Sequence, residues 1–360
     1  MSTVFTSELK EGMITLSDTY STKGNLVLQK DTVITKSIIN KLVANSVLLV
    51  EISDEPLEED TGFDFMSEFT IDEEAIIKTP EYKKFKNRYN KNISIMSDHF
   101  NDIIKKNAPL ETDTMLNNAL SIIKSTDSPL SIFPMISTLK NYDSSTFNHS
   151  LNVALICNIF GHWLEMSDDE VELLTSCGLF HDVGKLLIPE EIIKKPGKLT
   201  DEEYQLIQNH SKLGYDLLKK HNVDIHIQYA ALMHHEKMDG SGYPLGLTGD
   251  QIDKYAQIVT IADIYEAMTA NRVYRSALSP FTVINSFEED GLKKYNPKYL
   301  LTFLERVVNS YMNCKVKLSN GIEGDIVYIN KVRLAKPMVK TDSGFIDLSK
   351  ETGVSIESIL

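Results

Sequence analysis

The chain has 360 residues, of which 42% are hydrophobic and 24% charged, as in a folded globular protein, so disorder of the whole chain is excluded. No stretch approaches the ~20 apolar residues of a bilayer helix, and the first residues do not resemble a secretory signal, so we expect a cytoplasmic protein without a membrane span. The net charge of −14 disfavours DNA as a partner and requires that an anionic ligand be held by a local site of metal, lysine and arginine.

Residues 1–52 predict a small α+β module. Residues 25–28 and 47–50 are short apolar runs typical of strands, and residues 37–42 between them have helical spacing. Residues 53–78 are expected to form an acidic linker, because residues 51–74 contain many acids and no lysine or arginine. An acidic interaction tail is the alternative to a solvated connector.

Residues 79–129 are expected to form a helical connector. Its start combines a capping hydroxyl, a proline and an acid at Thr79, Pro80 and Glu81. An apolar stripe at spacings of three and four follows, formed by Phe85, Tyr89, Ile93, Met96, Phe100 and Ile103. The stripe predicts a helix packed on its own domain, and the seam of a homodimer is the alternative.

Helical patterns dominate residues 130–312, and a β-rich extension is expected at 313–360. Residues 315–318 alternate, 319–321 are a hairpin turn, and 324–329 form a second strand. The predicted fold class is therefore mainly α, with a small α+β N-terminal module and a short β-rich C-terminal tail.

Five histidines and two aspartates occupy apolar helical contexts: His149, His181, Asp182, His210, His234, His235 and Asp263. A lone buried histidine is usually a satisfied core residue, and a His–Asp doublet can be an ion pair or a cap. Together, however, these residues would bury too many polar groups for separate explanations, and a metal site accounts for all of them. Seven ligands exceed the needs of one ion, so we expect two divalent ions bridged by Asp182. The ligand types suit iron, manganese, zinc or nickel.

The motifs around these residues form an ordered set: HDVGK at 181–185, IP at 188–189, KPGKLT at 195–200, HHEKMDGSGYP at 234–244, IADIYEAMT at 261–269 and NRVYR at 271–275. This set resembles the HD superfamily of metal-dependent phosphohydrolases, and within it the HD-GYP subgroup, over about residues 130–312. The resemblance implies a helical HD-domain bundle with a cluster of two or three metals, among which we favour iron. It also implies hydrolysis of cyclic di-GMP to pGpG, and onward to GMP, which we expect to proceed by attack of a metal-bridging hydroxide.

The same resemblance assigns roles to residues of this chain. Metal ligation falls to the five histidines and two aspartates named above. Asp182 and Lys185 are expected to be catalytic, and Lys185 and Arg272 to contact phosphate. Gly242, Tyr243 and Pro244 form a loop that is expected to shape the substrate pocket and to contact a protein partner.

Three positions depart from the family pattern. Ser145 stands where members with a third metal have glutamate, so we expect two metals. Met238 and Gln257 replace a usual tryptophan and arginine. Two alternatives stay open: an HD-type hydrolase of another cyclic dinucleotide or nucleotide phosphate, and a catalytically weak, metal-loaded sensor or interaction module.

Overall fold

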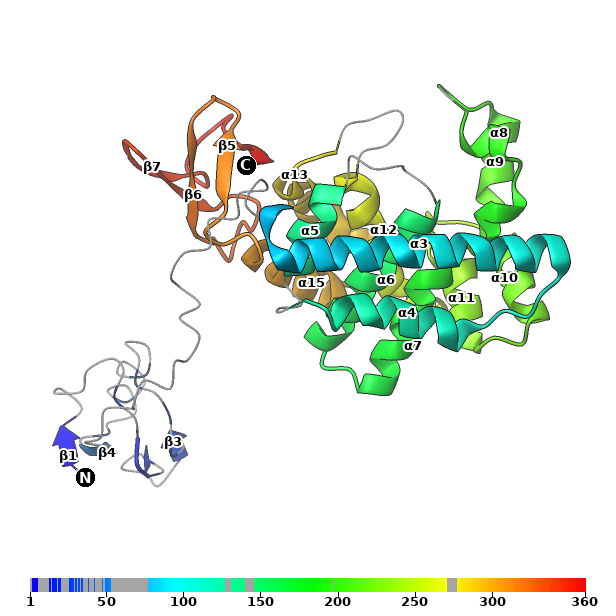
Figure 1. The fold of residues 1–360 in the computed structure, drawn as a ribbon. Coiled ribbons are helices and arrows are strands. Elements are labelled where there is room, and N and C mark those ends of the chain that lie inside the picture. Colours follow the sequence, from blue (N-terminus) through cyan, green and yellow to red (C-terminus); the bar gives the residue numbers. More distant parts are fainter. Residues whose placement is uncertain are drawn as a thin grey trace. The chain divides into compact units, whose positions relative to one another are not determined.

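The structure is a computed structural model, and its contacts divide the chain into two compact units, Met1–Ser67 and Glu68–Leu360 (Figure 1). It describes residues 2–5, 13, 15–17, 19–20, 26–28, 30, 32, 34, 38, 42, 47, 49–52, 77–126, 131–139, 146–195, 197–270 and 277–360. The predicted acidic linker lies almost wholly outside these residues. The fold class is mainly α, as predicted, while the finer division into five segments stays a prediction.

The described residues of the N-terminal unit include two antiparallel strand pairs. β1 (Ser2–Phe5) pairs with β4 (Leu49–Ile52), and β2 (Thr19–Tyr20) pairs with β3 (Leu26–Leu28). β3 and β4 overlap the predicted apolar runs. Ile38 and Leu42 are helical, and the unit has its own small core formed by Val27, Leu28, Ile34, Leu42, Val47, Val50 and Ile52.

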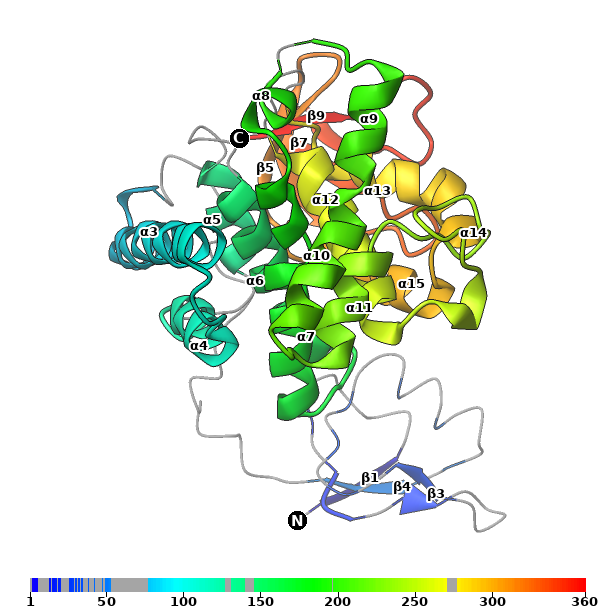
Figure 2. The ribbon, with the colours of Figure 1, turned by 90° about the vertical axis from the view of Figure 1, so that its right-hand side faces the viewer.

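The connector begins with α3 (Pro80–Lys106), and its predicted start is confirmed because the Thr79 hydroxyl accepts a hydrogen bond from the Tyr82 amide at 3.0 Å. The apolar stripe is buried in the core of the same unit, apart from the partly buried Ile93. Helix α4 (Thr112–Ile123) lies beside α3 on one flank of the bundle, and both pack on α6 (Figure 2). The apolar stripe of α3 therefore packs against helices of the same chain, as predicted.

The centre of the bundle is formed by helices in which more than half of the residues are buried. They are α6 (Thr146–Trp163), α7 (Asp168–Phe180), α11 (Ile225–Met233) and α12 (Lys254–Thr269). The elements around them are α5 (Ile132–Thr138), the 3-10 helix η4 (Val183–Leu187), α8 (Glu190–Ile193), α9 (Asp201–Gln208), α10 (His210–Lys220) and the 3-10 helix η5 (Gly249–Gln251). None of the described helices is both long and apolar enough to cross a bilayer.

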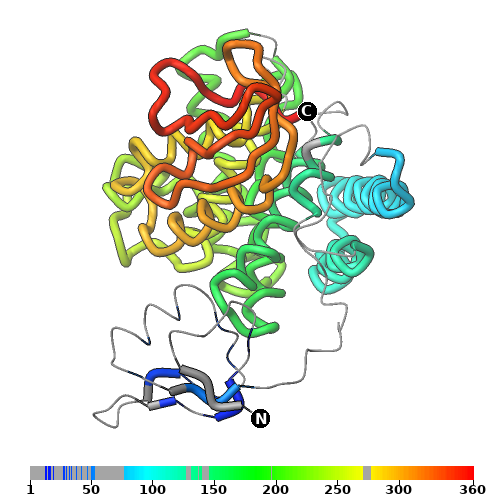
Figure 3. The backbone as a smooth tube through the Cα atoms, turned by 90° about the vertical axis from the view of Figure 1, so that its left-hand side faces the viewer, coloured from blue at the N-terminus to red at the C-terminus, as the bar shows by residue number. Residues whose placement is uncertain are grey.

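The C-terminal strands cover one end of the bundle (Figure 3). Before them come α13 (Pro280–Ser286), the π-helix η6 (Phe287–Gly291), α14 (Leu292–Lys294) and α15 (Pro297–Asn309). The strands are β5 (Lys315–Leu318), β6 (Glu323–Tyr328), β7 (Met338–Thr341), β8 (Gly344–Asp347) and β9 (Ile356–Ile359). They form an antiparallel sheet in the order β8-β7-β6-β5-β9, and their buried side chains join the helical core in one continuous cluster.

Gly184 is required by the close approach of η4 to α10. A Cβ at this position would lie 2.0 Å from the His210 carbonyl oxygen and 2.5 Å from the Gly214 nitrogen. We expect Gly184→Ala to lower the free energy of unfolding by about 1–3 kcal/mol, because backbone atoms cannot move aside as a flexible side chain can. Urea unfolding followed by circular dichroism measures this change.

The matched control is Gly161→Ala in α6, where the nearest atom is a Val171 methyl carbon at 3.0 Å. Here the contact is to a side chain, and alanine favours the helix by ~1 kcal/mol over glycine. Equal unfolding free energies for the two variants would contradict the packing described for Gly184.

Candidate metal centre

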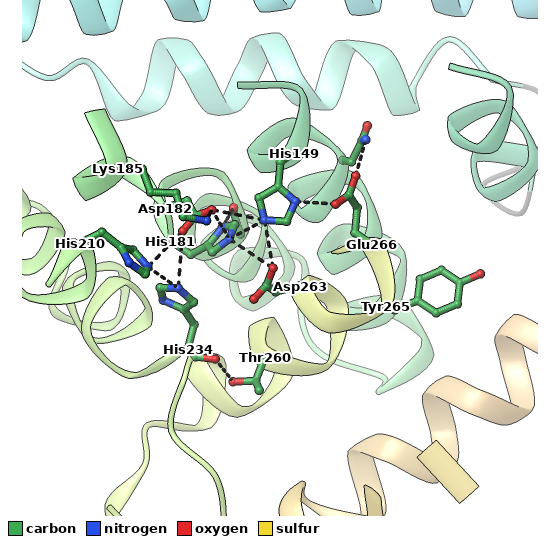
Figure 4. A network of polar contacts seen from close by, with 12 residues as sticks. His149, His181, Asp182, Lys185, His210, His234, Thr260, Asp263, Tyr265 and Glu266 are labelled. Carbon is green, nitrogen blue, oxygen red and sulfur yellow. Dashed lines mark hydrogen bonds and ion pairs between the residues drawn. The ribbon is translucent and has the colours of Figure 1, made fainter. Parts of the chain in front are cut away.

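The structure brings the seven predicted ligands together in one largely buried cluster. Figure 4 labels all of them except His235. His149 comes from α6, His181 and Asp182 from the end of α7, His210 from the start of α10, His234 and His235 from the end of α11, and Asp263 from α12. Their ligand atoms form three overlapping groups, each within 4.8 Å: Asp182, His210, His234 and His235; His149, His181 and Asp182; and His181, His234 and Asp263.

Asp182 lies at the centre of the cluster and is fully buried. Its Oδ1 is 3.3 Å from His210 Nε2 and 3.6 Å from His234 Nε2. Its Oδ2 is 3.3 Å from His149 Nε2 and 3.5 Å from His181 Nε2. The two oxygens of one carboxylate therefore face two different pairs of imidazoles.

A break between two helices gives Asp182 this position. Helix α7 ends at Phe180, and η4 begins directly after Asp182, whose own φ and ψ of −100° and 8° are not helical. The new turn brings Lys185 Nζ to 2.5 Å from Asp182 Oδ2. Burial opposes ionisation of Asp182, but Lys185 and the surrounding imidazoles hold the pKa of its carboxyl well below the usual range.

Backbone carbonyls fix the direction in which three of the imidazoles point. Nδ1 of His181 donates to the Gly178 carbonyl at 2.7 Å, and Nδ1 of His210 donates to the Ile207 carbonyl at 2.6 Å. Nδ1 of His234 is 3.0 Å from the Ala230 carbonyl. With the proton on Nδ1, each ring directs the lone pair of Nε2 into the cluster.

The convergence of these lone pairs fits a bound cation. Burial lowers the pKa of His181 to about 3 and also lowers the pKa of His210, although Asp182 opposes both shifts. His210 Nε2 and His234 Nε2 nevertheless face each other at 3.2 Å, where two lone pairs repel unless a proton or metal lies between them. Asp182 Oδ1 is buried, and no described group hydrogen-bonds to it. A metal ion satisfies all these atoms at once.

His149 is held on its outer side by Glu266, a residue to which the sequence analysis assigned no role. The distance from His149 Nδ1 to Glu266 Oε2 is 2.5 Å, and the Asn152 amide donates to Glu266 Oε1 at 2.9 Å. Burial opposes charging of His149, but Glu266, Asp182 and Asp263 raise its pKa well above the ordinary value. The carboxylates thus favour a positive charge here. Spacing would have found Glu266, since it lies three residues, about one turn, after Asp263 on α12.

The loop that contains Gly242, Tyr243 and Pro244, called the GYP loop below, is held closed by the buried carboxylate of Glu236. Glu236 accepts hydrogen bonds from the Leu245 amide at 2.6 Å and from the Leu247 amide at 2.9 Å. A Cβ on Gly242 would lie 2.4 Å from Glu236 Cα, so only glycine fits there. This role of Glu236 was not predicted, because it depends on how the loop returns.

The loop borders the metal-ligand cluster through Tyr243. Its ring stacks on His235, with centroids 4.6 Å apart and an interplanar angle of 29°. The centroids of the His235 and His234 rings are 4.0 Å apart, and both residues offer a ligand atom to the group that also contains Asp182 and His210. Pro244 is exposed next to Tyr243. Arg272 and Ser145 lie outside the described residues, and the expectations attached to them stay predictions.

Comparison with known proteins identifies the helical part of the chain. Residues 134–299 match the family described as HD domain. The protein named Cyclic di-GMP phosphodiesterase PA4108, from Pseudomonas aeruginosa, is 33% identical over 204 residues, which are 56% of this chain and 49% of that protein. The 3'3'-cGAMP-specific phosphodiesterase 1 of Vibrio cholerae is 43% identical over 141 residues, which are 39% of this chain and 32% of that protein. The chain thus spans about half or less of the length of these relatives.

A solved structure shares the fold over most of the chain. Bd1817, described as a HDG"Y"P protein from Bdellovibrio bacteriovorus, matches 85% of this chain and 99% of its own with a TM-score of 0.50 and 15% identity. At that identity the likeness concerns the fold alone. The family match covers residues 134–299, the part of the chain that contains the ordered motifs, and it agrees with the resemblance that those motifs predicted.

Proposed function

We propose that this chain is a metal-dependent phosphodiesterase that hydrolyses cyclic di-GMP to pGpG and onward to GMP. The observation that carries the proposal is the Asp182 carboxylate, whose two oxygens face different pairs of imidazoles. One side chain shared between two sets of nitrogen ligands suits a pair of bridged metals, the arrangement used in many phosphoryl displacements. The relatives named as phosphodiesterases of cyclic dinucleotides support the substrate class.

Two divalent ions would share Asp182 in this proposal. One would be bound by His210, His234 and His235, and the other by His149, His181 and Asp263. Ligands of this type suit iron, which we favour, or manganese, zinc or nickel. When bound, such a pair supplies hydroxide at neutral pH and neutralises charge on a phosphate.

Lys185 is the described cation best placed to meet a phosphate at this cluster. Its Nζ contacts Asp182, while 20% of its side chain is exposed, so it connects the buried ligands with solvent. Once Asp182 is engaged by metals, the ammonium is available to donate to a phosphate oxygen. Arg272 is proposed for a second phosphate contact on its motif alone.

The GYP loop is proposed to border the nucleotide. Tyr243 stacks on His235 and offers an aromatic face beside the proposed metal ligands, on which a purine can stack. Leu245, which is 57% exposed, and the exposed Pro244 are the proposed contacts for a protein partner, since apolar side chains at a loop tip lose water on binding.

A second candidate substrate is 3'3'-cGAMP. The 43% identical relative is named for that substrate, and its matched region covers 39% of this chain. The two cyclic dinucleotides have the same phosphodiester groups and differ in one purine base. The proposed metal and lysine contacts therefore serve both, and contacts to the base decide between them.

Asp182→Asn is expected to lower bound metal from about two ions per chain to less than one, and to reduce turnover of cyclic di-GMP by roughly 100-fold or more. A neutral amide cannot balance two divalent charges. Metal analysis of anaerobically purified protein and chromatography of the products measure both effects.

The control is Asp290→Asn, which removes an exposed carboxylate paired with Lys294 on the surface. This variant should keep the metal content and turnover of the wild type. Full activity in Asp182→Asn, with the fold intact, would contradict the metal assignment. Bound metal without turnover in the wild type would favour the sensor alternative.

Wild-type protein reloaded with Fe²⁺ or Mn²⁺ is expected to hydrolyse cyclic di-GMP with a higher kcat/KM than 3'3'-cGAMP, and to lose both activities on chelation. The comparison uses one enzyme sample, equal substrate concentrations and separation of linear dinucleotide from mononucleotide. A kcat/KM higher for 3'3'-cGAMP would replace the first substrate by the second while leaving the metal chemistry in place.

A further inference from the structure

A chain of hydrogen bonds leads from the connector helix α3 to His149. The Tyr89 hydroxyl donates to Asn152 Oδ1 at 2.8 Å, and its contact with the Asn148 carbonyl oxygen is longer, at 3.2 Å. The Asn152 amide donates to Glu266 Oε1 at 2.9 Å. Glu266 Oε2 then lies 2.5 Å from His149 Nδ1. A dashed line joins these two side chains in Figure 4. All four side chains are buried.

The chemistry of the groups fixes the direction of this chain. An ionised carboxylate only accepts hydrogen bonds, so Asn152 must present its NH₂ group to Glu266. Its carbonyl oxygen then faces Tyr89, which must donate. Rotation of the amide would place Asn152 Oδ1 against the carboxylate oxygen of Glu266. The Tyr89 hydroxyl therefore holds Asn152 in the one orientation that also supports Glu266.

Tyr89, the donor at the outer end of these hydrogen bonds, lies outside the residues that match the HD domain family. Tyr89 belongs to α3, whereas the family match begins at residue 134. Asn152 lies three residues after His149 on α6, so the chain crosses from one helix of the connector into the helix that carries the ligand. A buried acceptor that loses its donor is left without a hydrogen-bond partner, so this contact depends on the position of α3.

We propose that Tyr89 is a positioning residue for the metal centre, acting through Asn152 and Glu266 to orient the His149 imidazole. The inference rests on the proposed metal cluster. Residues that hold a ligating histidine through its second nitrogen set its orientation and basicity, and their loss commonly weakens metal affinity 10–100-fold. Tyr89 acts one step further out, so its hydroxyl should contribute less than Glu266.

The test is a Mn²⁺ titration of the full chain under anaerobic conditions, with free Mn²⁺ read by electron paramagnetic resonance. Tyr89→Phe keeps the ring and removes the donor, and it is expected to weaken Mn²⁺ binding roughly 3–10-fold. Tyr82→Phe is the control, because Tyr82 is equally buried on α3 and none of the described groups hydrogen-bonds to its hydroxyl. Its affinity should stay within about twofold of wild type.

A double-mutant cycle separates the hydrogen-bonded chain from simple packing. In an Asn152→Ala background, Tyr89→Phe should have no further effect on Mn²⁺ affinity, because the link to Glu266 is already lost. Glu266→Gln is a second variant, expected to weaken binding by about 10–100-fold. Thermal unfolding of the metal-free variants checks that the fold persists.

The outcomes are distinct. Equal Mn²⁺ affinities for wild type and Tyr89→Phe, or equal effects of Tyr89→Phe with and without Asn152, would overturn the positioning role and leave the proposed function intact. Failure of the wild type to bind Mn²⁺ or Fe²⁺ would remove the metal centre and this inference with it. A loss of Mn²⁺ affinity in Tyr89→Phe, Asn152→Ala and Glu266→Gln, but not in Tyr82→Phe, supports the proposal.

Discussion

The helical bundle is organised around one carboxylate that is buried away from water. A buried aspartate without compensation costs several kcal/mol, and Asp182 is fully buried. Its compensation comes from imidazoles on α6, α7, α10 and α11 and from the ammonium of Lys185. Helices distant in sequence must therefore meet at one point. Gly184 permits this meeting, since a Cβ at this position would overlap the backbone of α10.

In the same arrangement, the lone pairs of the clustered side chains repel one another and attract a cation. Carbonyls hold the Nδ1 protons of His181, His210 and His234 outward, so the lone pairs converge inward in a low-dielectric core. A well-packed apolar centre would stabilise the bundle better. The residues of this cluster reduce the stability of the bundle, and all of them suit a metal ion. This combination is expected of a functional site.

The parts of the fold and site that the sequence predicted are those carried by local or strongly typed signals. The capped start of α3 depends on Thr79 and Pro80, which are neighbours. The residues of the histidine and aspartate cluster stand out because these residue types are rare in apolar helices, and the structure brings them together. The roles of Glu236 and Tyr89 were not predicted. Glu236 depends on the path of a loop, and Tyr89 looks in sequence like any other residue of an apolar stripe.

The hydrogen bond of the Tyr89 hydroxyl links helix α3 to the proposed metal site. An apolar contact between α3 and α6 tolerates a small rotation of either helix, because dispersion forces have no direction. A hydrogen bond to a buried amide does not tolerate such a rotation, since its energy falls steeply when the donor turns away. Because the hydrogen bonds that start at His149 end on a donor in α3, the orientation of this proposed metal ligand depends on a helix that precedes it in the sequence. The connector is thus part of the site in a physical sense, although none of its residues is proposed as a metal ligand.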